Sequence, residues 1–138
     1  MALAQTLCSS FKQESWLGIH DLDTDVLKMA LYTSAASLGA DTTVYTATGE
    51  VSGTNYTAGG EILVNVQVLL SGTTSYATFD NPAWTGVSFT ARGALIYNTS
   101  KANRAIAVLD FGADKFAGPN FTVQLPAPTA TTALLRFA

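Results

Sequence analysis

The sequence contains few charged side chains. Charged residues make up 12% of it, against about 25% in an average soluble domain, and the net charge is −3. A surface with so little charge gives copies of the chain only weak electrostatic repulsion. The 7 basic residues are scattered singly, so no basic stripe is available to neutralise the phosphates of a nucleic acid. We therefore expect a chain that packs against protein partners and does not bind nucleic acid.

Cysteine and long apolar runs are equally scarce. Cys8 is the only cysteine, so no disulfide can form within the chain, and this fits a reducing compartment. Its neighbours are small and include no basic cluster, so we expect an inert packed thiol and not a nucleophile. No N-terminal signal peptide is evident, and apolar runs such as 105–109 are far shorter than the roughly 18 residues of a membrane span. The sequence predicts no membrane partner.

Histidine occurs once, as His20, and Asp21, Asp23 and Asp25 follow it closely. This spacing resembles a calcium loop, but the glycine and the glutamate that an EF-hand requires at its sixth and twelfth positions are replaced by valine and tyrosine. Zinc sites need several nitrogen or sulfur ligands, and a two-histidine site is impossible with one histidine. Because aspartate side chains accept hydrogen bonds from nearby backbone N–H groups, we expect a solvated polar turn and no metal-binding residue.

No other pattern in the sequence points to catalysis. The serine-containing segments 51–55 and 70–74 lack the glycine pair of a nucleophile elbow, and the glycine-rich segment 47–61 lacks the lysine of a phosphate loop. A paired-carboxylate glycosidase is conceivable on a jelly roll, but the sequence has only three glutamates and its aspartates lie mostly in expected turns. We therefore predict a protein that is not an enzyme, with no catalytic residue and no cofactor.

Hydrophobic periodicity predicts a helix only at the N-terminus. Leu3, Leu7 and Phe11 recur at helical spacing, and Gly18 is a natural stop. Residues 1–18 are therefore expected to form a helical arm. A helix of this length is marginal on its own in water, so it must dock on something.

Residues 26–138 alternate apolar and polar side chains with the period of β-strands. The alternation is most regular over residues 61–70, where the even-numbered side chains from Ile62 to Leu70 are expected to face a core. The other candidate strands are 26–33, 74–79, 84–90, 93–98, 104–111, 119–125 and 132–137. About eight strands without intervening helices predict an all-β fold, a β-sandwich or jelly roll, and a chain of this length is expected to form one domain, 1–138.

Two features of the strand region are candidates for contacts. Residues 47–61 are rich in glycine and have no apolar period, so they are expected to form a long loop of the kind that often carries a function or an interface. Arg92 and Arg104 flank a hairpin-like unit, where we expect them to form structural ion pairs with Asp80 or Asp110.

The segments SFKQE, LGIHD, LKMALYTS, TTVYTATGEVSGTNYTAGG, FTARGALIYNTSKANRAIAVLDFG and the final LLRFA follow one another in the chain. In this order, from Phe11 to Ala138, they resemble a family of small proteins encoded in the structural modules of tailed bacteriophages and prophages. The resemblance implies a virion structural protein with no catalytic residues.

Within that family, the size and the predicted all-β fold favour a capsid decoration or cement protein on the outer surface of the head. The resemblance then implies synthesis in the host bacterial cytoplasm and two kinds of partner, the major capsid protein and copies of the chain itself, often as trimers. A tail, neck or baseplate component is the first alternative. A carbohydrate-binding or receptor-binding module is the second, with Trp84, Tyr45, Tyr56 and Tyr76 as its aromatic candidates, although the apolar context of Trp84 favours the core or an interface.

Overall fold

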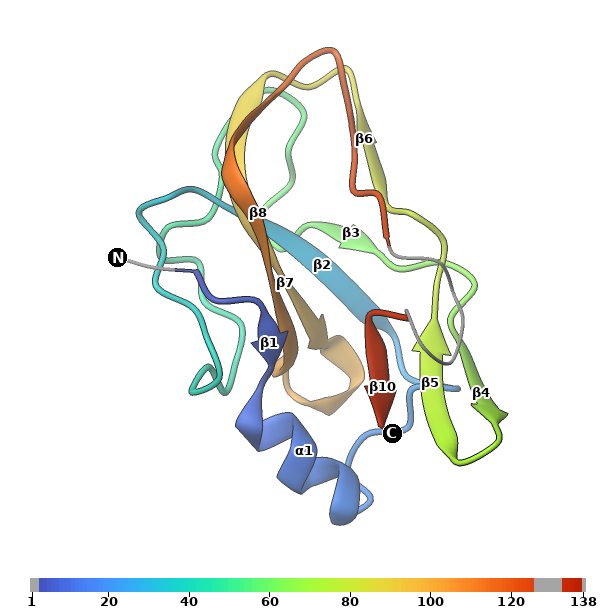
Figure 1. Cartoon of the computed structure of the whole chain (residues 1–138). Coiled ribbons are helices and arrows are strands. Elements are labelled where there is room, and N and C mark those ends of the chain that lie inside the picture. The colour runs from blue at the N-terminus through green and yellow to red at the C-terminus, as the bar shows by residue number, and fades with distance from the viewer. Residues whose placement is uncertain (1–2, 126–132, 138) are drawn as a thin grey trace.

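The computed structural model describes residues 3–125 and 133–137, and these contain ten strands, one α-helix and one 3-10 turn. The strands form three antiparallel sheets with the orders β1-β8-β7-β2-β3, β10-β5-β4 and β6-β9. The five-stranded sheet forms one layer, and the two smaller sheets lie beside it, the two-stranded sheet above the three-stranded one (Figure 1). The predicted all-β fold with one short N-terminal helix is confirmed.

The elements have the following bounds. The five-stranded sheet contains β1 (Thr6–Leu7), β8 (Arg104–Ala117), β7 (Phe89–Asn98), β2 (Leu27–Tyr32) and β3 (Glu61–Ile62). The smaller sheets contain β10 (Leu135–Phe137), β5 (Thr74–Thr78) and β4 (Gln67–Ser71), and β6 (Ala83–Thr85) and β9 (Asn120–Thr122). The helix α1 covers Ser9–Trp16, and the 3-10 turn η1, Thr99–Lys101, joins β7 to β8.

The core is centred on β2 and β7. Leu27, Met29 and Leu31 are at most 1% exposed, as the alternation in residues 26–33 predicts. Tyr32, on the opposite face of β2, is fully buried as well, because the chain between β2 and β3 lies over that face and accepts its hydroxyl proton at the carbonyl of Thr46. Each such apolar side chain contributes about 1.5–3 kcal/mol when it is fully buried.

The N-terminal arm is shorter than residues 1–18 suggested. Its first part pairs with β8 as the strand β1, because the edge of β8 offers backbone partners: the Cys8 N–H donates to the Ile106 carbonyl at 2.9 Å. The helix α1 follows, docks on β8 through the buried Phe11, and ends before Gly18, which has a φ of +73°. The predicted stop is therefore correct, the predicted start is wrong, and residues 1 and 2 lie outside the described residues.

Residues 61–70 do not form one strand with an inward apolar face. The strand is interrupted between β3 and β4, where Asn65 has a φ of 60°, and Leu63 is the residue that is buried instead. Four of the five even-numbered side chains that were expected to be buried are exposed, Ile62 55%, Val64 60%, Val68 45% and Leu70 75%, and Val66 is half-buried against the core. The alternation shows that one face is apolar, and the structure shows that, of this face, only Val66 among the described residues packs against the chain's own core.

The remaining strand predictions differ from the structure mainly at their ends. Residues 84–90 are divided between β6 and β7 at Gly86, which has a φ of +63°. The candidate strands 93–98 and 104–111 lie within β7 and β8, which form one long hairpin. The last candidate strand, 132–137, corresponds to β10, although residue 132 lies outside the described part of the chain.

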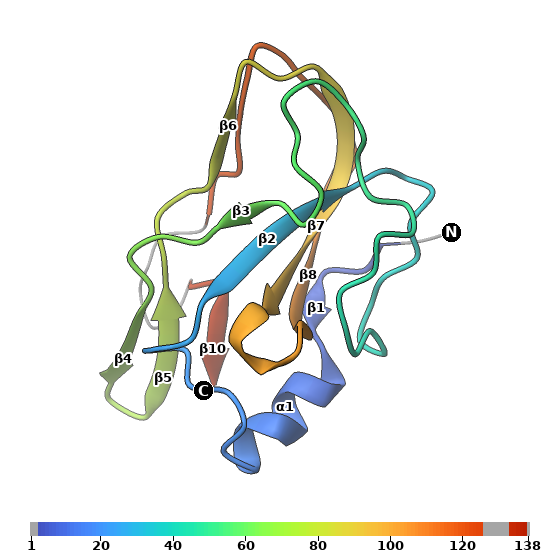
Figure 2. The same ribbon diagram turned by 180° about the vertical axis from the view of Figure 1, so that it is seen from behind.

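The long loop predicted over 47–61 is part of a longer connection between β2 and β3 (Figure 2). It returns to β2 at Gly60, where the backbone has a φ of +85° and an added Cβ would lie 1.8 Å from the Met29 carbonyl oxygen. Only glycine allows this close approach. The loop is thus held against its own sheet.

Candidate binding surface

His20 lies at the centre of a buried polar network. Its side chain is 1% exposed, and it connects Glu14 of α1, whose Oε1 is 2.8 Å from His20 Nε2, to Asn98 at the end of β7, whose Nδ2 is 3.0 Å from His20 Nδ1. Glu14 also accepts a 2.7 Å hydrogen bond from Arg104 of β8. The network therefore joins the helix to the β7–β8 hairpin.

Asp25 completes this network on the far side of Asn98. Its carboxylate accepts hydrogen bonds from Asn98 Nδ2 and Lys101 Nζ, both at 2.7 Å, and from the Asp21 N–H at 2.9 Å. Burial raises the pKa of Asp25, but these three hydrogen bonds and the charge of Lys101 together lower it below its usual value.

The asparagine fixes the tautomer of the histidine. Asn98 Oδ1 accepts from the Ser100 N–H at 3.0 Å, so its amide nitrogen must face the other way. The two protons of that nitrogen then meet Asp25 Oδ2 and His20 Nδ1, which makes Nδ1 an acceptor and leaves the imidazole proton on Nε2, where it is donated to Glu14.

The prediction of a solvated turn is correct for Asp21 and Asp23, which are exposed, and wrong for His20 and Asp25. The expected aspartate-to-backbone hydrogen bond is present at Asp25. Within residues 3–125 and 133–137, no group of three or more His, Cys, Asp or Glu side chains is arranged to hold a metal ion. The network links α1 to the end of β7 and to β8.

Replacing His20 with glutamine is expected to lower the free energy of unfolding by about 1–3 kcal/mol, because the glutamine amide can still donate to Glu14 while Asn98 loses an acceptor. Asp23→Asn, an exposed change in the same turn, is expected to cost less than about 0.5 kcal/mol. Urea denaturation followed by circular dichroism measures both values. Equal losses in the two variants would show that the network contributes no stability.

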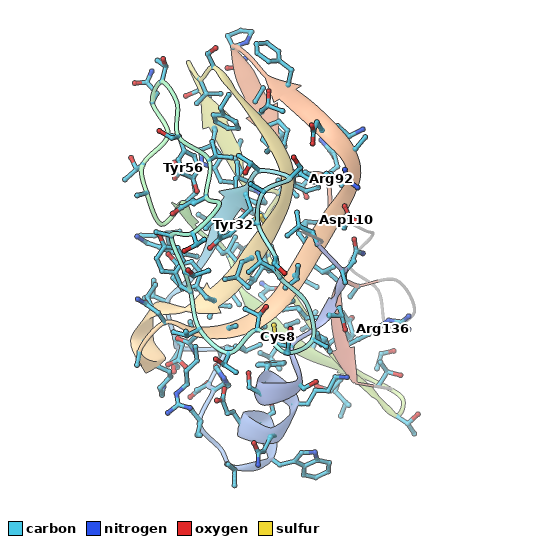
Figure 3. The ribbon with its side chains drawn as sticks, turned by 90° about the vertical axis from the view of Figure 1, so that its left-hand side faces the viewer. Cys8, Tyr32, Tyr56, Arg92, Asp110 and Arg136 are labelled. Atoms are coloured by element: carbon cyan, nitrogen blue, oxygen red, sulfur yellow. The ribbon has the colours of Figure 1, made fainter. Side chains whose placement is uncertain are left out.

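A second, partly buried network holds the loop between β2 and β3. Glu50 accepts hydrogen bonds from Tyr45 at 2.5 Å, from Tyr56 at 2.6 Å and from the Gly59 N–H at 2.7 Å. Tyr56 in turn accepts from the Leu31 N–H of β2 at 2.9 Å, and its ring lies beside that strand together with Tyr32 (Figure 3). One carboxylate therefore organises the predicted loop, and sequence reasoning missed its role.

Burial and the nearby carboxylate of Glu50 raise the pKa of Tyr97, whose hydroxyl donates to the Gly59 carbonyl, to about 12. Between pH 10 and 12 this tyrosine is neutral in the folded chain and ionised in the unfolded chain, so the unfolded state binds fewer protons. Stability is therefore fully present below pH 10 and is expected to fall above it by about 1.4 kcal/mol per pH unit from Tyr97. Urea denaturation across this range measures how steeply the free energy of unfolding falls with pH. Tyr97→Phe removes one titrating group, so it should remove the contribution of one proton from this slope.

The aromatic candidates for a sugar-binding face are mostly used internally. Trp84 is 2% exposed and lies in the core, as expected, and its Nε1–H has no hydrogen-bond partner among the described residues. Tyr45 and Tyr56 are engaged by Glu50. Tyr76 alone among the four remains at a partly exposed position with no such role, and a single ring is not a stacking platform.

The other side-chain predictions have mixed outcomes. Arg92 pairs with Asp110 at 3.2 Å (Figure 3), as expected, and the Gly112 N–H and Arg92 lower the pKa of Asp110. Arg104 pairs with Glu14 and not with either predicted aspartate. Cys8 is fully buried, and burial raises its pKa to about 11, which disfavours the reactive thiolate.

An open groove lies between α1 and the three-stranded sheet. It consists of two cavities, of about 440 Å³ and about 790 Å³, and Leu7, Ser75 and Arg136 line both of them. Figures 1 and 2 both show α1 and the strands β4, β5 and β10 on opposite sides of this lower end of the molecule. The small sheet thus turns an incompletely covered face toward the helix.

Of the exposed apolar side chains, Trp16, Val68 and Leu70 line this groove, and Leu17 and Leu69 are their neighbours in the sequence. Trp16 and Leu17 at the end of α1 are 92% and 66% exposed, and Val68, Leu69 and Leu70 of β4 are 45%, 39% and 75% exposed. No charged residue occurs from position 62 to position 79. This surface, rather than either polar network, is the candidate functional site, because large apolar patches on soluble proteins mark contact sites.

No protein-family model, curated protein or solved structure matches this chain. Among the described residues, no helix is both long and apolar enough to cross a membrane.

Proposed function

We propose that this chain is a virion structural protein of a tailed bacteriophage, a decoration or cement protein that binds the outer surface of the major capsid lattice. In this role it is not an enzyme. It is made in the host cytoplasm, and its partners are the major capsid protein and other copies of itself. The proposal joins the resemblance in the sequence to the surface of the structure.

The observation that carries the proposal is the exposed apolar surface. Ten large hydrophobic side chains are at least 39% exposed among the described residues, in a chain of which only 12% is charged. A free monomer with such a surface has little charge to prevent association. A protein whose surface is covered by neighbouring subunits does not need surface charge to keep its copies apart.

The engagement of the polar side chains supports a role in assembly. His20 is held between Glu14 and Asn98, and Glu50 between two tyrosines and a backbone amide. These are the groups best suited to acid–base chemistry, and each of them holds one segment of the fold to another. These polar side chains stabilise the fold, and exposed apolar side chains remain for contacts with partners.

A lattice also explains how modest contacts suffice. Many copies bound to a repeating surface gain from multivalency, because contacts between neighbours raise the effective concentration of each copy. Each contact can then be weak without the shell of copies being lost.

Quantifying the chain in purified particles tests the proposal. We expect a copy number comparable to that of the major capsid protein, retention on heads that have lost their tails, and rebinding of purified protein to stripped heads. A copy number that corresponds to one ring of subunits, with the protein following the tails, would overturn the decoration role and favour the tail, neck or baseplate. Absence from particles would overturn the virion role itself.

A further inference from the structure

β4 is an edge strand that lacks the usual protection. Among the described residues it pairs only with β5, in an uninterrupted register from Gln67 to Ser71, and all five of its residues are exposed. Natural edge strands are normally blunted by a charged side chain, a proline or a bulge. β4 has none of these, and within residues 3–125 and 133–137 no backbone group pairs with its outer edge.

The groove beside β4 carries charges of opposite sign at its two ends. The cavity next to Val68 is lined by Asp21 and Asp23, the cavity next to Leu70 is lined by Lys12, and Arg136 lines both. Along β4 from Val68 to Leu70, the charged residues that line the groove therefore change from mainly acidic to basic.

We propose that this surface joins two copies of the chain, with β4 pairing antiparallel to the β4 of the second copy. The inference rests on the proposed function in one respect, that the chain works as many copies packed side by side. A twofold axis normal to the sheet, midway between Leu69 and the partner's Leu69, places Val68 opposite the partner's Leu70. The two three-stranded sheets become one six-stranded sheet, and both grooves lie on the same face of it.

The charges of the groove agree with this symmetry. The twofold axis reverses the direction of the second groove, so the end that carries Lys12 approaches the end that carries the partner's Asp21 and the partner's Asp23. A parallel arrangement would bring like charges together. Complementary charge of this kind fixes the register of an interface and suppresses other arrangements.

The exposed area is sufficient for a stable pair. Trp16 offers about 200 Å², and Leu17, Val68, Leu69 and Leu70 offer roughly 60 Å² each when their exposed fractions are counted. The total is on the order of 450 Å², which is the apolar share of the about 800 Å² that each partner buries in a standard interface. A strand from another protein would satisfy the same edge, but the match between the two ends of the groove is specific to a second copy.

The mass of the purified chain in solution tests the inference. Light scattering after size exclusion is expected to give twice the monomer mass of 14.5 kDa, and Leu70→Glu is expected to weaken the dimer about thirtyfold or more, the effect of losing a central contact. Val64→Glu is the matched control, because Val64 is also apolar and 60% exposed but lies outside the groove, and it should leave the dimer unchanged.

A charge exchange tests the symmetry itself. Lys12→Glu is expected to weaken the dimer, and adding Asp23→Lys in the same chain is expected to restore it, because each copy then presents the reversed pair to the other. A change that only disturbed the fold would not be restored in this way.

The outcomes separate this inference from the proposed function. A monomer at high concentration, or a trimer that Leu70→Glu does not affect, would overturn the inference. A monomer that binds heads and loses that binding with Leu70→Glu would assign the edge to the capsid protein and leave the proposed function intact. A dimer that dissociates with Leu70→Glu but never binds heads would support the inference and overturn the function.

Discussion

Replacing Gly60 with alanine is expected to lower the free energy of unfolding by about 3–5 kcal/mol. Two costs add at this position. The backbone φ of +85° is unfavourable for any residue with a Cβ, and that Cβ would lie 1.8 Å from the carbonyl oxygen of Met29 in the central strand β2. The oxygen belongs to the backbone, so the loop or the strand must move as a whole. Urea denaturation measures the loss.

Gly72→Ala is the matched control for this prediction. Gly72 has a φ of +59°, and an added Cβ there meets nothing within 4 Å, so this variant carries the conformational cost alone, about 1 kcal/mol. The difference between the two variants therefore measures the close approach of the loop to β2. Equal losses would mean that the loop adjusts freely at Gly60.

Replacing Glu50 with alanine is expected to cost about 3–5 kcal/mol, because the hydroxyls of Tyr45 and Tyr56 and the N–H of Gly59 lose their acceptor together. Each polar group left without a partner in a buried site costs about 1–3 kcal/mol. The loop that these groups hold covers one face of β2, so its release is expected to expose Tyr32 as well. Denaturation midpoints and near-ultraviolet circular dichroism, which reports on the tyrosines, measure the two effects.

Two further variants serve as controls for the result at Glu50. Glu50→Gln keeps the shape and one acceptor oxygen, so it should cost about 1–2 kcal/mol. Glu61→Ala removes an exposed glutamate from the short strand β3 and should cost less than about 0.5 kcal/mol. If Glu50→Ala is no worse than Glu61→Ala, the carboxylate is not the anchor of the loop.

Local patterns predicted the fold class because most of the strands carry their own signal. The alternation over 26–33 identifies β2, and the dense apolar runs around 93–98 and 104–111 identify the central hairpin. The pattern over 61–70 predicted the wrong environment because period two reports that one face is apolar, and it does not report whether a core or another molecule covers that face. The absence of charged residues from 62 to 79 was the available signal for a face that is covered by another molecule and not by the core.

The polar networks could not be predicted from the sequence. The sequence predicts no metal or catalytic motif at His20, since no second histidine and no glycine at the required loop position accompany it. Its true partners, Glu14 and Asn98, are brought to it by the docking of α1 and by the end of β7, and no local spacing connects them. The role of Glu50 could not be predicted either, because its contacts with Tyr45, Tyr56 and Gly59 depend on how a glycine-rich loop is folded.

The ion pair between Glu14 and Arg104 has a consequence for synthesis of the chain. The two residues are 90 positions apart, and contacts of such long separation form late. The β7–β8 hairpin can form locally across its short turn, whereas α1 leaves the ribosome long before β8 exists. During that interval Glu14 has no Arg104 to pair with, so the N-terminal helix docks on β8 only after most of the chain has been made.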